Sequence, residues 1–136
     1  EDIPVLTIAC CGDSLTEAGY PRELQRTLCA HCGHEVSWRV LNLGASGATV
    51  REKPLGYVKS RPFQRALESA ADVVAVLLGT NDAHQALWDE DDFIAQLSSL
   101  VRQIQESGDR HKRSPTIFLG VPPPLYHTDH VLSSRL

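Results

Sequence analysis

A chain of 136 residues with 42% hydrophobic and 22% charged side chains has the size and composition of one globular domain. Its formal net charge of −4 argues against a nucleic-acid-binding surface, and no apolar run reaches the roughly 20 residues of a membrane span. The sequence begins at Glu1, contains no methionine and stops at Leu136. We therefore expect residues 1–136 to form a single domain that is truncated at its C-terminus.

Four apolar stretches predict strands, and the capped or amphipathic stretches between them predict helices. The expected strands are residues 3–9, 36–40, 72–78 and 116–121, and the expected helices are 21–32, 63–69 and 89–104. The second strand alternates apolar and polar residues, which is typical of a strand near a sheet edge. Strands that alternate with helices favour an α/β fold. We expect a three-layer α/β/α, flavodoxin-like parallel sheet of order 2-1-3-4 with a fifth strand missing.

The cysteines and the acidic run could be mistaken for metal sites. A zinc site would need a second paired motif beside Cys29 and Cys32, and a thioredoxin-like CxxC would open a helix, whereas this one closes a helix. We expect these two and Cys10–Cys11 to be free thiols that are buried or partly buried. The acidic run 89–92 is expected to cap a helix rather than to bind a cation. No metal and no organic cofactor are predicted.

A loop rich in small and polar residues follows each of the first three strands. The loops are Gly12-Asp13-Ser14, the glycine-containing run 42–50 and Gly79-Thr80-Asn81-Asp82. The carboxyl ends of parallel strands meet at one edge of a sheet, where ligands bind in open α/β folds. A serine hydroxyl, a backbone N–H made accessible by glycine and an asparagine amide are the groups that acyl transfer needs. The sequence therefore predicts a nucleophile and an oxyanion hole at this edge.

The three motifs GDSLTEAG, NLGASGAT and GTND resemble the first three blocks of the GDSL, or SGNH, hydrolase superfamily. The resemblance implies that Ser14 is the nucleophile and an oxyanion donor, with Gly44 as backbone donor and Asn81 as side-chain donor. The wider runs, from about residue 3 to about residue 126, are similar to carbohydrate O-acetylesterases, including sialate O-acetylesterase-like proteins. This implies removal of acetyl groups from a carbohydrate or small-molecule ester. Gly44 as a simple turn residue and Asn81 as a helix cap stay open as alternatives.

The family's last block, Asp-x-x-His, supplies the general base and has no match here. His127 and His130 follow the proline run without an intervening strand, and the residue three before His130 is not an aspartate. Either the base lies beyond Leu136, which we favour and which implies that this chain is inactive on its own, or one of these two histidines substitutes for it. His84, close to the third loop, is expected to face solvent.

Two further consequences follow from the missing block. A sheet that lacks its last strand and helix would expose apolar surface along one edge and one face, so we expect the piece alone to be marginally stable or prone to aggregation. Alternatively, the chain is a catalytically inactive binding module or a non-functional fragment that keeps the fold. Nucleotide binding is disfavoured, because the sequence has no glycine pattern of a phosphate loop.

Overall fold

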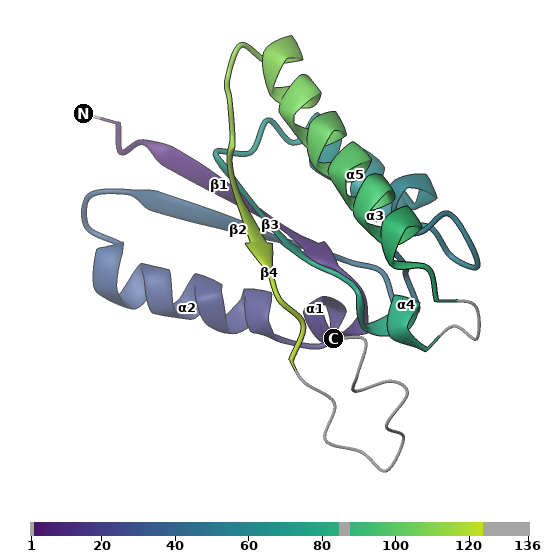
Figure 1. Ribbon diagram of the computed structural model, residues 1–136. Helices are drawn as coiled ribbons and strands as arrows, with labels where there is room; N and C mark the ends of the chain where they lie inside the picture. Colours follow the sequence, from purple (N-terminus) through teal and green to yellow (C-terminus); the bar gives the residue numbers. More distant parts are fainter. Residues whose placement is uncertain (1, 85–87, 124–136) are drawn as a thin grey trace.

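The computed structural model describes residues 2–84 and 88–123 and contains one parallel four-stranded sheet (Figure 1). The strands, in the spatial order β2-β1-β3-β4, are β1 (Val5–Gly12), β2 (Ser37–Gly44), β3 (Val73–Leu77) and β4 (Thr116–Gly120). The helices are α1 (Ser14–Glu17), α2 (Tyr20–Cys32), the 3₁₀ turn η1 (Tyr57–Lys59), α3 (Arg61–Glu68), α4 (Thr80–Ala83) and α5 (Glu90–Arg110). The expected strand order is confirmed, and so is the α/β class.

The helices cover the sheet from two sides, with α2 on one face and α3 and α5 on the other (Figure 1). The main core lies under α3 and α5, where Val74 and Val76 of β3 meet Phe63, Leu100 and Ile104. These five side chains are at most 3% exposed. Burial of such residues supplies the main stabilisation of the domain, because it removes apolar surface from water.

The first two strands extend further toward their carboxyl ends than the apolar patterns predict. β1 continues through Cys10 and Cys11, both fully buried, and ends at Gly12. Free cysteine behaves as a small hydrophobic residue, so this pair continues the buried strand. β2 runs on to Gly44, which is aligned with Gly12. The first two of the three loops with predicted site residues therefore begin at aligned positions of neighbouring strands.

The outer edge of β2 is covered by one side chain of α2. Gln25 donates from Nε2 to the Trp38 carbonyl (2.8 Å) and accepts at Oε1 from the Val40 N–H (2.8 Å). An edge strand presents unpaired backbone groups, and one amide here satisfies two of them. The prediction that this strand lies at a sheet edge is confirmed.

The opposite edge strand, β4, leaves apolar side chains in contact with solvent. Phe118, Leu119 and Val121 are 61%, 52% and 82% exposed. Phe118 and Leu119 point to opposite faces of the sheet, because neighbouring residues of a strand alternate. The expected apolar exposure at one edge is thus present among the described residues, whereas aggregation of the chain stays a prediction.

The acidic run acts as a helix cap, as expected. Asp89 is the N-cap of α5, and its Oδ1 accepts a hydrogen bond from the Asp92 N–H (3.1 Å). Carboxylates in the first turn also complement the helix dipole. Within residues 2–84 and 88–123, no group of three or more metal-ligating side chains converges.

The four cysteines are free thiols in two different environments. Cys10 and Cys11 are buried, as predicted, but Cys29 and Cys32 are exposed on the last turns of α2. The prediction of burial was wrong for this second pair, because both residues lie on the solvent side of a helix that covers the sheet edge. No helix in the described part of the chain is long and apolar enough to cross a membrane.

Candidate active site

The register of the sheet brings the three loops to one edge. Gly12 of β1 is aligned with Gly44 on one side and with Leu77 on the other. Ser14 begins α1 two residues after Gly12, and Asn81 lies in α4 four residues after Leu77. The three sequence-predicted site residues therefore share the carboxyl edge of the sheet, as their positions after the strands predict.

Ser14 is the first residue of α1 and is exposed to solvent. Asp13 caps this short helix, because its Oδ1 accepts a hydrogen bond from the Leu15 N–H (2.9 Å). Asp13 is only 1% exposed, and burial raises the pKa of its carboxyl. The backbone N–H of Ser14 has no hydrogen-bond partner among the described residues. This serine thus presents both its hydroxyl and its amide at the edge.

Gly44 allows α1 to approach β2. A Cβ atom at this position would lie 2.3 Å from the backbone nitrogen of Glu17, so any side chain would collide with α1. The N–H of Gly44 already donates to Asn42 Oδ1 (3.1 Å), and Asn42 Nδ2 donates to the Glu17 carbonyl (3.0 Å). The next residue, Ala45, donates its N–H to Gly12 of β1 (2.9 Å). Since successive N–H groups of a strand alternate in direction, the Gly44 N–H points away from β1.

Gly47 is a second glycine of the same loop, and the sequence pattern predicted no separate role for it. It has a φ of +80°, a left-handed conformation that favours glycine. The Ala48 N–H closes the turn around it by donating to the Ala45 carbonyl (3.0 Å), whereas the Gly47 N–H has no partner in residues 2–84 and 88–123. The signal available in the sequence was the glycine between Ser46 and Ala48, the point of a small-residue loop where a backbone group is most accessible.

Asn81 connects the third loop to the second. Its Nδ2 donates to the Ala48 carbonyl at 3.0 Å, one residue after Gly47. The side chain is partly buried, and this bond orients the amide at the sheet edge. Asn81 lies within α4 rather than before it, and Gly79 is the N-cap residue. The alternative in which Asn81 is only a helix cap is therefore wrong.

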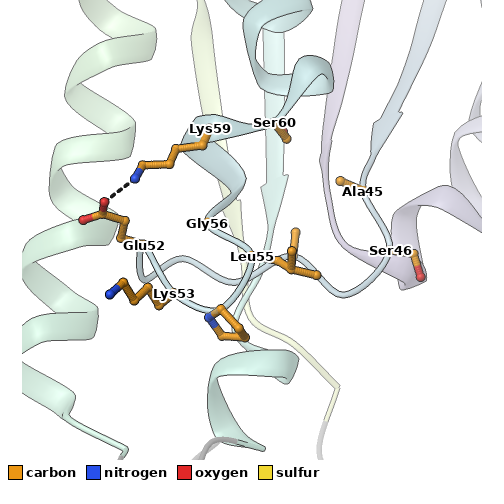
Figure 2. Close-up of a pocket in the computed structure, with 10 residues that line it drawn as sticks. Ala45, Ser46, Glu52, Lys53, Leu55, Gly56, Lys59 and Ser60 are labelled. Atoms are coloured by element: carbon orange, nitrogen blue, oxygen red, sulfur yellow. Dashed lines mark hydrogen bonds and ion pairs between the residues drawn. The ribbon is translucent and has the colours of Figure 1, made fainter.

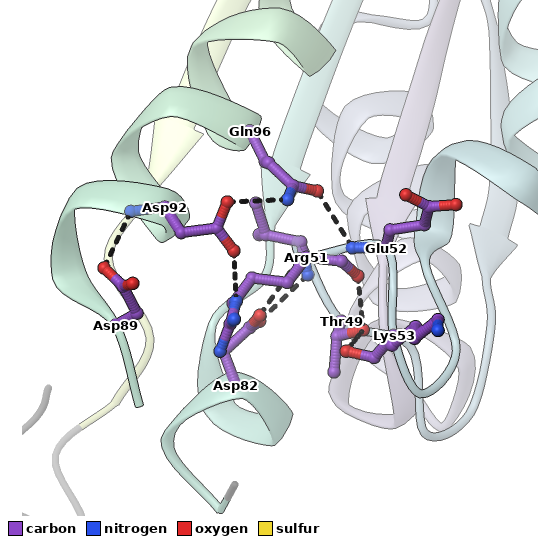
Figure 3. A network of polar contacts seen from close by, with 9 residues as sticks. Thr49, Arg51, Glu52, Lys53, Asp82, Asp89, Asp92 and Gln96 are labelled. Carbon is purple, nitrogen blue, oxygen red and sulfur yellow. Dashed lines mark hydrogen bonds and ion pairs between the residues drawn. The ribbon is translucent and has the colours of Figure 1, made fainter. Parts of the chain in front are cut away.

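Asp82 is fully buried and fixes the end of the second loop (Figure 3). Its Oδ2 accepts from the Val50 N–H (2.9 Å) and its Oδ1 from the Arg51 N–H (3.1 Å). Burial raises the pKa of this carboxyl, and the two backbone donors partly oppose that shift. Arg51 in turn donates from Nε to Asp92 Oδ2 of α5 at 2.5 Å. The loop is thus tied to two helices.

A pocket of about 390 Å³ lies against the outer side of the second loop (Figure 2). It is lined by Ala45, Ser46 and Ala48 of the loop and, further along the chain, by residues 52–56, Lys59 and Ser60. Lys59 and Glu52 form an ion pair at its rim, which lowers the pKa of the Glu52 carboxyl. The pocket begins one residue after Gly44 and provides space for a ligand beside the edge.

The described histidines offer no partner to Ser14. His84 follows α4 at the carboxyl edge and is exposed, as predicted. Those at the ends of α2 and α5 lie toward the amino edge, where β2 and β4 begin; they are His31, His34 and His111. His127 and His130, the predicted substitute bases, lie outside the described residues.

A model of a protein family described as the GDSL-like lipase/acylhydrolase family matches residues 10–135. No curated protein sequence matches the chain. Among solved structures, the inhibitor-bound aryl esterase of M. smegmatis has a TM-score of 0.61 and 24% identity over 88% of this chain. Est24, a carbohydrate acetylesterase from Sinorhizobium meliloti, has a TM-score of 0.58 and 23% identity over 88% of this chain. The chain spans 65% of each of these two proteins.

A family two carbohydrate esterase from Clostridium thermocellum, in complex with cellohexaose, is also similar. It has a TM-score of 0.61 and 18% identity over 94% of this chain, and the chain spans 46% of its length. At these identities the three structures show that the α/β fold is shared.

Proposed function

The chain belongs to the GDSL-like lipase/acylhydrolase family, and on that premise we propose that it carries the nucleophile and the oxyanion hole of a serine esterase. The observation that carries the proposal is the position of Ser14. Its hydroxyl is exposed at the start of a helix, its own N–H has no partner among the described residues, and Asn81 lies at the same sheet edge. Ser14 Oγ attacks the ester carbonyl, and the carbonyl oxygen becomes an oxyanion that needs nearby donors.

The proposed oxyanion hole consists of the Ser14 N–H, the Asn81 Nδ2 group and one backbone N–H of the second loop. The sequence predicted Gly44 for this last donor. We favour Gly47, because the Gly44 N–H points away from β1 and already donates to Asn42. The Gly47 N–H is unpartnered within the described residues and lies one residue from the carbonyl that Asn81 contacts. Gly44 then serves the close packing of α1 against β2.

The general base is proposed to lie outside the described residues. Serine needs a base that takes the proton of Oγ and later activates the water that hydrolyses the acyl-enzyme. No histidine in residues 2–84 and 88–123 has a hydrogen bond to Ser14, and only His84 lies at its edge. Within the sequence, His127 and His130 are the remaining candidates.

The proposed substrate is an O-acetyl ester of a carbohydrate. Support comes from the sequence resemblance described above and from two similar structures, one named a carbohydrate acetylesterase and one a carbohydrate esterase. The pocket beside the second loop is lined by polar and charged side chains as well as by Leu55, which suits an alcohol with several hydroxyl groups.

A fluorophosphonate probe tests the proposal, because it phosphonylates only serines that are activated for attack. If His127 or His130 is the base, we expect one adduct per chain by intact mass on the native protein and none on Ser14→Ala. If the base lies beyond Leu136, we expect no adduct on the folded chain, and one adduct when the same test is repeated on a chain extended beyond Leu136. A folded, extended chain without adduct would contradict the esterase and favour the binding module. Activity that needs His127 or His130 would appear as loss of the adduct in His127→Ala or His130→Ala.

A further inference from the structure

The turn that presents Gly47 is held at both of its ends but not at Gly47 itself. At the start, the Ala45 N–H donates to the Gly12 carbonyl of β1 (2.9 Å). At the far end, the N–H groups of Val50 and Arg51 donate to the carboxylate of Asp82. The position of the Gly47 N–H therefore depends on how firmly these two ends are fixed.

Asp82 has the properties of a firm anchor. Each carboxylate oxygen accepts one backbone N–H, and the residue is 0% exposed. Hydrogen bonds to a carboxylate are stronger than those between neutral groups, and water does not compete with them at a buried site. Asp82 also directly follows Asn81, whose amide contacts the same segment at Ala48. One turn of α4 thus controls both the second loop and the orientation of the Asn81 side chain.

We propose that Asp82 is a positioning residue for ester hydrolysis, which clamps residues 48–51 so that the Gly47 N–H and the Asn81 amide point at the same oxyanion. The proposal rests on the proposed function. Asp82 touches neither the substrate nor Ser14 in this role, and it acts only through the loop that it holds. Preorganised donors stabilise a developing charge because they need not reorient during the reaction.

A second tie extends the clamp to α5. Arg51 pairs with Asp92 in the first turn of that helix, and Gln96 donates to Asp92 Oδ1 at 2.9 Å (Figure 3). Gln96 also accepts the Glu52 N–H through Oε1 (2.9 Å). Arg51 and Glu52, the two residues that directly follow the second loop, are therefore both connected to α5. Because α5 is the longest helix in the described part of the chain and packs on the core, it provides a rigid support.

The chemistry of the site predicts which change breaks the clamp. In Asp82→Asn the side chain keeps its shape but has only one oxygen, so an NH₂ group would face either the Val50 or the Arg51 N–H. This NH₂ group and the backbone N–H that it faces are both donors, so neither has an acceptor at this buried site. The loop must therefore move. Asp72→Asn is the matched control. Asp72 also accepts a backbone N–H, from Thr7 (2.8 Å), and an arginine, Arg113 (2.9 Å), but it lies at the amino edge of the sheet.

The experiment compares the native chain of residues 1–136 with both variants. It measures the second-order rate of labelling by a fluorophosphonate and, by ¹H–¹⁵N NMR, the chemical shifts of the Gly47 backbone amide and the Asn81 side chain. In Asp82→Asn we expect labelling to slow by about tenfold or more, with both signals shifted or broadened. In Asp72→Asn we expect the native rate and native signals.

Equal rates and unchanged Gly47 and Asn81 signals in folded Asp82→Asn would overturn the clamp. So would equal slowing in both variants, because that result would report a general loss of stability. If the native chain is not labelled at all, no base within it activates Ser14, and the NMR signals alone then decide whether Asp82 positions the loop. If Asp82→Asn does not fold, Arg51→Gln and Asp92→Asn replace it. Native Gly47 signals in both of these variants would contradict the clamp.

Discussion

Replacement of Gly44 by alanine tests how the sheet positions the nucleophile. The added Cβ would lie 2.3 Å from the backbone nitrogen of Glu17 and 2.7 Å from its Cα, whereas ordinary van der Waals contacts begin at 3.4 Å. The atoms belong to the backbone of α1, so no side-chain rotation relieves the overlap. The helix that begins at Ser14 must therefore move by about 1 Å or tilt away from β2. Overpacking usually costs about 1–3 kcal/mol, and a backbone collision falls at the upper end of that range.

Gly19→Ala is the matched control, because a Cβ atom at Gly19 would meet no atom within 4 Å. The same change of residue there creates no collision, but Gly19 is the N-cap residue of α2, where glycine is preferred to alanine, so we expect a loss of at most about 1 kcal/mol. Urea unfolding, followed by far-UV circular dichroism, gives both free energies of unfolding. We expect Gly44→Ala to lose about 2–3 kcal/mol relative to the native chain. Equal stability of the two variants would refute the close packing of α1 on β2.

Two further predictions concern thiols and protons. A thiol reagent at pH 8 should label Cys29 and Cys32 in the folded protein and leave Cys10 and Cys11 unmodified, since burial raises the pKa of both latter thiols, that of Cys11 to about 11. Mass spectrometry that finds four labels before unfolding would contradict this. Burial also raises the pKa of the Asp13 carboxyl, so the folded chain binds the proton of this carboxyl more tightly than the unfolded chain does. Its contribution to stability should therefore fall as the pH rises through the raised pKa. Asp13→Asn keeps the helix cap without the charge. In urea unfolding between pH 4 and 7, its free energy of unfolding should decline less with rising pH than that of the native chain; parallel profiles for the two proteins would refute the raised pKa of Asp13.

The sequence patterns predicted the sheet well, because β1 and β3 are mostly apolar on both faces, β2 begins with alternating polar and apolar residues, and the long helix has regular apolar spacing. Ile104 and Leu100 mark the buried side of α5, and Asp89 marks its start. Strand ends were harder to predict. Cys10 and Cys11 continue β1 as buried side chains, and only the pairing of Gly12 with Gly44 shows where the loops begin.

The candidate site was predicted in its parts but not in its connections. Ser14 and Asn81 follow strands, so topology alone places them at one edge. The direction of a backbone N–H depends on strand register and turn conformation, which residue types do not reveal. The hydrogen bond from Gly44 to Asn42 and the left-handed φ of Gly47 therefore emerged only in three dimensions. Asp82 is equally hidden in sequence, because its partners are backbone groups more than 30 residues away.

The most direct test of the account is a ¹H–¹⁵N NMR spectrum of the chain after phosphonylation of Ser14. The phosphonyl oxygen occupies the position of the oxyanion, so the donors of the hole should report it. We predict the largest shifts at the backbone amides of Ser14 and Gly47 and at the Asn81 side chain, with a small change at Gly44. A labelled protein in which Gly44 shifts and Gly47 does not would contradict the proposed hole.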